Sequence, residues 1–204
     1  MFNQATINNT PKELLAEFYK NYNLGDDGGQ SSSHVRIELT KNFYFYIPNF
    51  DARRKAVFKH DIHHLATGYE SIMKGETEIS TWEIASGCKS YWAAFLINMQ
   101  GMIMGIPMLN IKGIFQAFKR GSRTENLYSD KFTEEQVLNM TIGEIRAHLK
   151  LDTYDKDTNI PSTFEDFLYF ILYLILGECL ALISLLFLPV IIIYTLYVMV
   201  FKPQ

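Results

Sequence analysis

Apolar and polar positions along the chain predict helices over most of its length. After Thr10-Pro11, apolar residues recur at helical spacing with a proline in the first turn, and Thr133–Gln136 has the form of a capping box. Segment IGEIRAHLKL supplies a later helix. Only HVRIELT alternates apolar and polar residues as a strand does, and NFYFYIP follows it. We therefore expect a mostly α fold with at most a minor sheet.

The middle of the chain predicts two helices that carry most of the chemistry. Asn49 or Asp51 is expected to cap the first, which bears residues 56–65 with their histidines. Gly68 and Gly75 then punctuate the chain before ETEISTWEIASG, the second helix.

Hydrophobicity rises sharply near residue 164. From Phe167 to Phe201 the only charged side chain at neutral pH is that of Glu178. These residues as one helix would extend roughly 52 Å, well beyond the roughly 30 Å core of a bilayer. We predict an interfacial helix over about 164–177 and a transmembrane helix over about 179–201, with a kink at Pro189. A tight helical hairpin and a buried core helix are less favoured alternatives.

Composition sets further limits. The 204 residues are 48% hydrophobic and 20% charged, with a net charge of −3, so nucleic acid is not an expected partner. Cys88 and Cys179 are widely separated, which excludes a Cys-rich zinc module and argues against a disulfide framework. The N-terminus lacks the basic head and apolar run of a secretory signal. We expect a helical domain over 1–160 that stays in the cytoplasm or an equivalent interior compartment, anchored by 161–204.

One short window suggests a metal site. His60 and His64 are four residues apart, so on a helix they share one face, roughly 40° apart, and Asp61 flanks that face. Glu76 lies at the start of the next helix, and an antiparallel return would bring it towards the pair. Two imidazoles and up to two carboxylates suit Zn²⁺, and Fe²⁺ or Mn²⁺ are tolerable. The predicted ligands are therefore His60, Asp61, His64 and Glu76.

The histidines also allow other interpretations. The HExxH metalloprotease motif fails because no Glu precedes the second histidine to act as general base. HDIHH also matches a box of membrane di-iron enzymes, which need several such boxes, whereas the chain has five histidines. A His-Asp phosphohydrolase, recruiting His34 and Asp152 to the His60-Asp61 doublet, remains an enzyme alternative.

The same window resembles the Coq-four family of ubiquinone-biosynthesis proteins, whose signature is HDxxH, eleven residues, then Glu. Here His60, Asp61 and His64 are followed by eleven residues and Glu76, and Trp82-Glu83 extends the match. The resemblance implies a helical fold, zinc on the four predicted ligands and affinity for polyprenyl lipids. It also implies removal of the C1 carboxylate of a quinone precursor, or organisation of the enzymes that process it, at a bacterial or mitochondrial inner membrane. The hydrophobic tail is a departure from the family.

A lipid surface is the last expectation. The segment from Trp92 to Phe115 is apolar and rich in Met and Gly, which suits domain core or a groove for an isoprenoid. Two functions of different class follow: a metal-dependent enzyme of quinone biosynthesis, or a non-catalytic lipid-binding subunit docked to a larger membrane complex. The basic residues just before the motif are expected to form a solvated helix end or, as the alternative, to contact lipid phosphates or a substrate carboxylate: Arg53, Arg54, Lys55 and Lys59.

Overall fold

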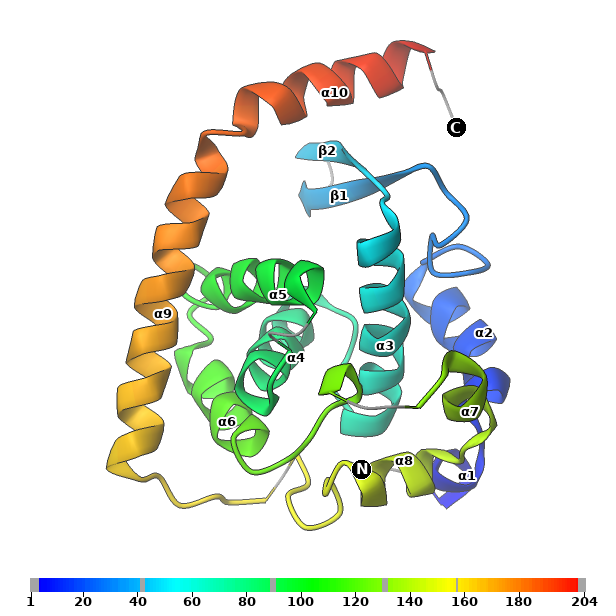
Figure 1. Ribbon diagram of the computed structural model, residues 1–204, viewed down its shortest axis with the longest axis vertical. Coiled ribbons are helices and arrows are strands. Elements are labelled where there is room, and N and C mark those ends of the chain that lie inside the picture. Colours follow the sequence, from blue (N-terminus) through cyan, green and yellow to red (C-terminus); the bar gives the residue numbers. More distant parts are fainter. Residues whose placement is uncertain (1–3, 41–42, 89–90, 130–131, 157, 202–204) are drawn as a thin grey trace.

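The computed structural model describes residues 4–40, 43–88, 91–129, 132–156 and 158–201, and this part of the chain is mostly helical, as predicted (Figure 1). Within these ranges, a single hairpin interrupts the helices. The elements in order are α1 (Gln4–Asn8), α2 (Pro11–Tyr22), β1 (His34–Thr40), β2 (Phe43–Pro48), α3 (Asp51–Thr67), α4 (Met73–Ser86), α5 (Trp92–Met104), α6 (Ile111–Gly121), the 3₁₀ turn η1 (Leu127–Ser129), α7 (Glu134–Asn139), α8 (Ile142–His148), α9 (Phe164–Leu185) and α10 (Leu188–Phe201).

Several helix starts follow directly from local sequence. Thr10 caps α2 and Thr133 caps α7, each in a capping box whose fourth residue returns a bond to the cap. The start of α3 differs from the prediction by one residue, because its N-cap is Phe50 rather than Asn49 or Asp51. The Asn49 side chain instead accepts a hydrogen bond from Arg53 Nη1 at 2.9 Å, so it ties the loop to the first turn.

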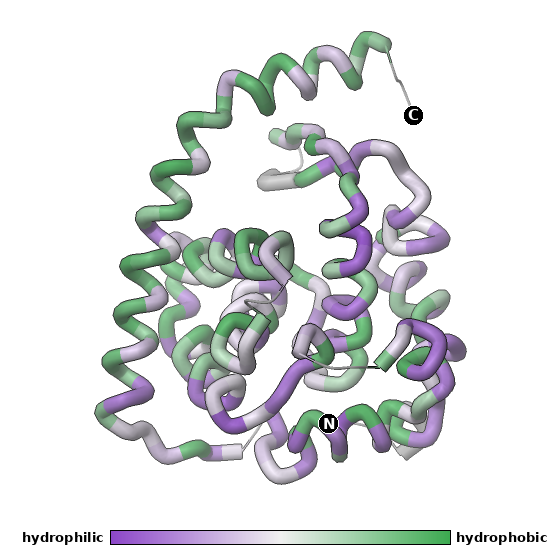
Figure 2. The backbone as a smooth tube through the Cα atoms, viewed as in Figure 1, coloured by the Kyte–Doolittle hydropathy of each residue, from purple (hydrophilic) through white to green (hydrophobic). Residues whose placement is uncertain are grey.

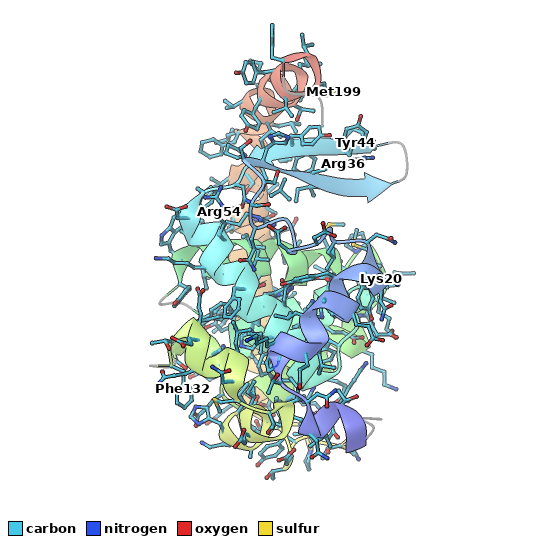
Figure 3. All side chains as sticks on the ribbon, turned by 90° about the vertical axis from the view of Figure 1, so that its right-hand side faces the viewer. Lys20, Arg36, Tyr44, Arg54, Phe132 and Met199 are labelled. Carbon is cyan, nitrogen blue, oxygen red and sulfur yellow. The ribbon has the colours of Figure 1, made fainter. Side chains whose placement is uncertain are left out.

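The predicted strand and its successor form an antiparallel hairpin. His34 pairs with Pro48 and Ile37 with Phe45, and Arg36 lies over the Tyr44 ring at 3.9 Å, beside it in Figure 3. Helix α10 packs on β2, where the Tyr46 backbone N–H donates to Thr195 Oγ1 at 3.0 Å.

The main core lies between α3, α4, α6 and α8. Its fully buried centre includes Ile62, Ile79, Trp82 and Ile145. Because Ile79 and Trp82 are three residues apart, they form one stripe of α4, and Ile62 brings in α3. This core fixes α3 against α4, which is the pair that carries the predicted metal ligands.

The apolar segment from Trp92 to Phe115 forms two helices rather than one. Helix α5 ends at Met104 and α6 begins at Ile111. Met99 and Met102 are fully buried, so one face of α5 is core, whereas Leu96 and Ile97 on the other face are exposed. The segment is therefore core on one side and an apolar surface on the other.

The C-terminal segment differs from the prediction in where it breaks. Helix α9 runs unbroken through Gly177 and Glu178 to Leu185, so residues 179–201 are not one helix. Pro189 explains the break, because its ring excludes the carbonyl of residue 185 from a continuous helix. Gly177 does not interrupt α9; instead it lets α9 approach α5, since a Cβ there would lie 2.7 Å from Ile103.

Helix α9 is long and apolar enough to cross a membrane by length and composition. Its mean hydropathy reaches 2.2, and only 11% of its apolar window is buried within the protein. Phe170 packs against α6, and the helix also contacts α5, yet most of its outer face is exposed. Figure 2 shows this hydrophobic stretch continuing into α10, which turns across the hairpin.

Candidate metal centre

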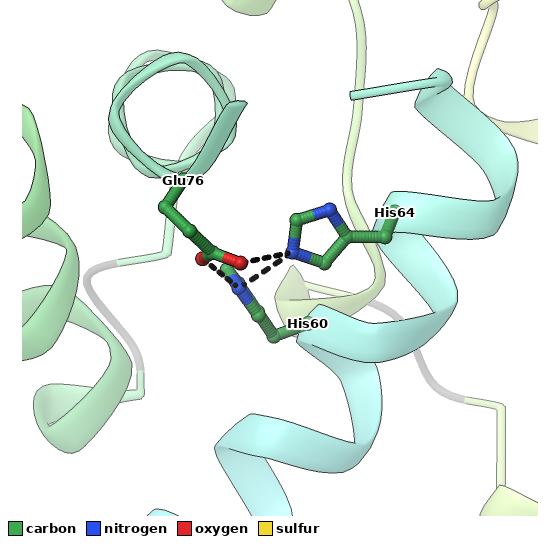
Figure 4. Close-up of side chains that lie close together, drawn as sticks. All are labelled: His60, His64 and Glu76. Atoms are coloured by element: carbon green, nitrogen blue, oxygen red, sulfur yellow. Dashed lines mark hydrogen bonds and ion pairs between the residues drawn. The ribbon is translucent and has the colours of Figure 1, made fainter. Parts of the chain in front are cut away.

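The turn between α3 and α4 brings the predicted ligands together. Helix α3 ends at Thr67 and is capped by Gly68, whose positive φ of 78° suits glycine, and α4 begins five residues after the cap. Gly75 lies inside the first turn of α4 rather than in the break. A glycine is needed there because a Cβ would overlap the Glu70 carbonyl oxygen. The close-up shows α4 end-on while α3 runs across the view, so the helices cross steeply instead of lying antiparallel (Figure 4).

Three side chains converge at this crossing. His60 Nε2 lies 3.2 Å from Glu76 Oε2, and His64 Nε2 lies 3.2 Å from Glu76 Oε1. The two Nε2 atoms are 3.1 Å apart (Figure 4). The His64 side chain is 1% exposed, that of His60 18% and that of Glu76 34%, so the cluster reaches solvent on the Glu76 side.

Each of the three groups also has a hydrogen-bond partner outside the cluster. His64 Nδ1 lies 2.8 Å from the Tyr69 carbonyl, so this nitrogen carries the proton and Nε2 presents its lone pair to the cluster. His60 Nδ1 faces Glu83 Oε1 at 3.0 Å, and Ser71 Oγ donates to Glu76 Oε1 at 2.6 Å. A carboxylate or carbonyl behind a ligating imidazole fixes its tautomer and orientation, as in many metal sites.

Glu83 is the centre of this supporting network. Its carboxylate is fully buried and accepts hydrogen bonds from His63 Nδ1 at 2.6 Å, from Tyr128 Oη at 3.1 Å and from Asn98 Nδ2. His63 Nε2 in turn accepts the Leu127 backbone N–H at 2.9 Å, so His63 is neutral and belongs to the support rather than to the cluster. Burial also lowers the pKa of His63, despite its contact with Glu83, and this favours the neutral imidazole.

The charges of the cluster are strongly coupled. Burial alone would lower the pKa of His60, but the carboxylates of Glu83 and Glu76 outweigh it and raise that pKa well above its usual value. Burial would likewise raise the pKa of Glu76, yet His64 and His60 lower it well below normal. Without a metal, His60 therefore holds a proton between two carboxylates. A metal ion held by His60 Nε2 would take the place of that proton.

The arrangement fits a divalent transition metal. One ligand atom from each of His60, His64 and Glu76 lies within 4.8 Å of the others. A tetrahedral ion with bonds of about 2.1 Å separates its ligand atoms by roughly 3.4 Å, close to the spacing of the three groups. Two imidazoles and one carboxylate form the set found in catalytic zinc sites and non-haem iron sites, which keep a position open for water or substrate.

The structure does not bring Asp61 into this cluster. Its Oδ2 accepts a hydrogen bond from Tyr19 Oη at 3.1 Å, on the side of α3 that packs on α2. Burial raises the pKa of Asp61 to about 6, although His60 and His64 act in the opposite direction. The cluster thus has three of the four predicted ligands, with Asp61 beside them.

The predicted lipid-contacting cations are engaged elsewhere. Arg53 bonds Asn49, and Arg54 donates to Asp51 at 2.7 Å, both at the hairpin end of α3, where Figure 3 marks Arg54. Lys59 is buried, and its Nζ donates to the Leu127 carbonyl at 2.5 Å. These three side chains stabilise the fold at their observed positions and do not line the cluster.

Sequence reasoning missed the supporting role of Glu83. Seven residues separate it from Glu76, two helical turns, so both lie on one face of α4. That spacing could have indicated that Glu83 lies on the same side of α4 as the predicted ligand Glu76. Comparisons of the chain with protein-family models, curated proteins and solved structures found no match.

Proposed function

We propose that this chain is a membrane-anchored protein that binds one divalent metal ion, with Zn²⁺ best suited, through His60, His64 and Glu76. The observation that carries the proposal is the convergence of these three groups, each backed by its own hydrogen-bond partner. A structural zinc site has four protein ligands, whereas three leave room for substrate. The geometry therefore favours a metal that takes part in chemistry over one that only holds helices.

We further propose that the substrate is a polyprenylated ring precursor of a quinone, processed at the ring carboxylate. The support is the spacing of His60, Asp61, His64 and Glu76, with Glu83 following, which resembles the Coq-four signature. When bound, a divalent ion would supply Lewis-acid charge next to a carboxylate or phenolate. The chain's own contribution would be to orient Nε2 of His60 and His64 towards that charge, through Glu83 and the Tyr69 carbonyl.

A quinone profile tests this role. In cells that depend on this protein, His64→Ala is expected to deplete the quinone and to accumulate a carboxylated, prenylated precursor, measured by lipid extraction and mass spectrometry. His148→Ala, an exposed histidine on α8, is the matched control and should leave the profile unchanged. Normal quinone in the His64→Ala strain would contradict the enzymatic proposal.

The membrane anchor is a second part of the proposal. Ile175 is 57% exposed near the middle of α9, where a lysine in lipid costs about 2.5–3.5 kcal/mol. Ile175→Lys is therefore expected to shift the protein from the carbonate-resistant membrane pellet to the soluble fraction. Asn139→Lys adds the same charge on the exposed face of α7 and should not change the distribution. Equal partition of both variants would contradict insertion through α9.

A non-catalytic role is favoured by one observation, the position of Glu178. This carboxylate is exposed within the apolar α9, and a charge in a membrane segment commonly has a partner. A lipid-binding subunit docked to a larger membrane complex would use it as the contact. That candidate predicts lost co-purification after Glu178→Leu together with a normal quinone profile after His64→Ala.

A further inference from the structure

A second polar site lies at the C-terminal end of α3, just beyond His64, where three cationic side chains meet the last carbonyls of the helix. Such groups complete the hydrogen bonds that a helix C-terminus leaves open and favour its negative end. The pairs are Arg146 Nη1 with Ala66 O at 2.7 Å, Arg120 Nη1 with Thr67 O at 2.9 Å, and Lys156 Nζ with Gly68 O at 3.2 Å.

Arg120 has a donor left over after this contact. Its Nε donates to the Tyr154 carbonyl at 2.7 Å and its Nη1 to Thr67, but its buried Nη2 has no hydrogen-bond partner. The nearest anion, Asp155 Oδ1, lies 3.7 Å from Nη2, beyond hydrogen-bond distance. The Arg120 side chain is 2% exposed, so water does not freely replace the missing acceptor. A buried donor of this kind favours a ligand that supplies an oxygen.

Arg120 lines a cavity of about 150 Å³. A cavity of about this volume accommodates a molecule of benzene size. Its buried walls come from Tyr69, Ala117, Arg120 and Ile160, which are all less than a tenth exposed. Its exposed rim consists of Gln116, Lys156 and Thr158, from α6 and the loop before α9. The cavity is therefore open to solvent and has one charged donor among its buried walls.

The charges around the cavity favour a singly charged anion. Glu78 forms a further wall, but its Oε1 already accepts from Asn110 at 3.1 Å and lies 4.0 Å from Lys74 Nζ. Asp155 is shared, with its Oδ2 3.4 Å from Arg146. Among the described residues, the carboxylate paired with Arg120 is therefore that of Asp155, which is divided between Arg120 and Arg146. Glu78 and Asp155 would repel a doubly charged phosphate more strongly than a carboxylate.

We propose that this cavity binds the carboxylate of a small monocarboxylic acid, with Arg120 Nη2 as the buried donor and Lys156 at the rim. Asp155 occupies the rim and competes with the ligand. The site is distinct from the metal cluster, and the proposal does not rest on the proposed function. Tyr69 joins the two places, since its side chain lines the cavity while its carbonyl holds His64.

The test is calorimetric titration of the full chain in detergent with propionate, at fixed ionic strength. Propionamide, the neutral analogue, and sodium phosphate are titrated in parallel. Propionate is expected to bind saturably, propionamide not to bind, and phosphate to bind more weakly than propionate. Neutralising the competitor in Asp155→Asn should tighten propionate binding about two- to fivefold, the range of an exposed charge pair.

Two further variants separate binding from folding. Gln116→Glu places a carboxylate on the exposed rim, where folding tolerates it, and should weaken propionate binding by a similar factor. Asp152→Asn is the matched control, because Asp152 contacts Arg146 at 3.1 Å from the same loop but does not line the cavity. Equal binding of propionate and propionamide, binding of phosphate alone, or equal effects of Asp155→Asn and Asp152→Asn would overturn the proposal.

Discussion

Replacing His64 by alanine is expected to abolish stoichiometric metal in the purified protein. His64 contributes one of three ligand groups, and its Nε2 is fixed towards the cluster by the Tyr69 carbonyl. Loss of an outer hydrogen-bond partner typically costs about 10–100-fold in metal affinity, and loss of a ligand itself should exceed about a hundredfold. Metal content by mass spectrometry, followed by competition with a zinc chelator, measures the effect.

Two controls make this result specific. His148→Ala removes an exposed histidine of α8 and should retain full metal content. Asp61→Asn should also retain the metal, because Asp61 faces Tyr19 rather than the three-residue cluster. Loss of metal in Asp61→Asn would restore the four-ligand interpretation. A metal-free wild type, or equal metal in His64→Ala, would contradict the site.

Proton release gives an independent readout of the same event. Because Glu83 and Glu76 raise the pKa of His60 despite its burial, the metal-free protein carries a proton there at neutral pH. Zinc binding should then release a proton, seen as a dependence of the binding heat on buffer ionisation enthalpy.

Much of the fold could be predicted because its signals are local. The boxes at Thr10 and Thr133 involve residues three positions apart, so sequence alone contains both partners. The break before Pro189 is equally local. Gly177 was misleading for the opposite reason: its meaning depends on Ile103, 74 positions away in sequence, against which it packs. The broken tail therefore could be expected, but its boundary could not.

For the metal cluster, too, the part that could be predicted rests on local spacing, and the part that could not depends on residues distant in sequence. His60 and His64 share a face by helical period, and Glu76 follows at a spacing that the turn closes. Asp61 seemed equivalent in sequence, but Tyr19 of α2 takes its carboxylate, a contact across 42 positions. Lys59 was expected at a surface and is instead buried, with its Nζ bonded to the Leu127 carbonyl. Helical periodicity predicts the face of the helix on which a side chain lies, whereas the tertiary packing determines which residue that side chain contacts.

Glu83→Leu is expected to be the most destabilising single change near the site. The substitution fits an apolar group into a buried position but removes the acceptor of His63, Tyr128 and Asn98 at once. Breaking a buried charged pair by deleting one partner costs about 3–5 kcal/mol. Denaturant unfolding of the metal-free protein, with chelator present, measures this loss without a contribution from metal binding.

Glu83→Gln separates the charge from the hydrogen bonds. Its amide oxygen still accepts one or two of the bonds, so the free energy of unfolding should fall by only about 1–3 kcal/mol. Metal affinity should nevertheless drop about 10–100-fold, because the neutral amide no longer supports the His60 imidazole as a carboxylate does. Glu135→Gln, an exposed change on α7, should alter neither quantity. If Glu83→Leu cost less than about 1 kcal/mol, the buried carboxylate would not be the centre of the network, because even one unsatisfied buried donor exceeds that value.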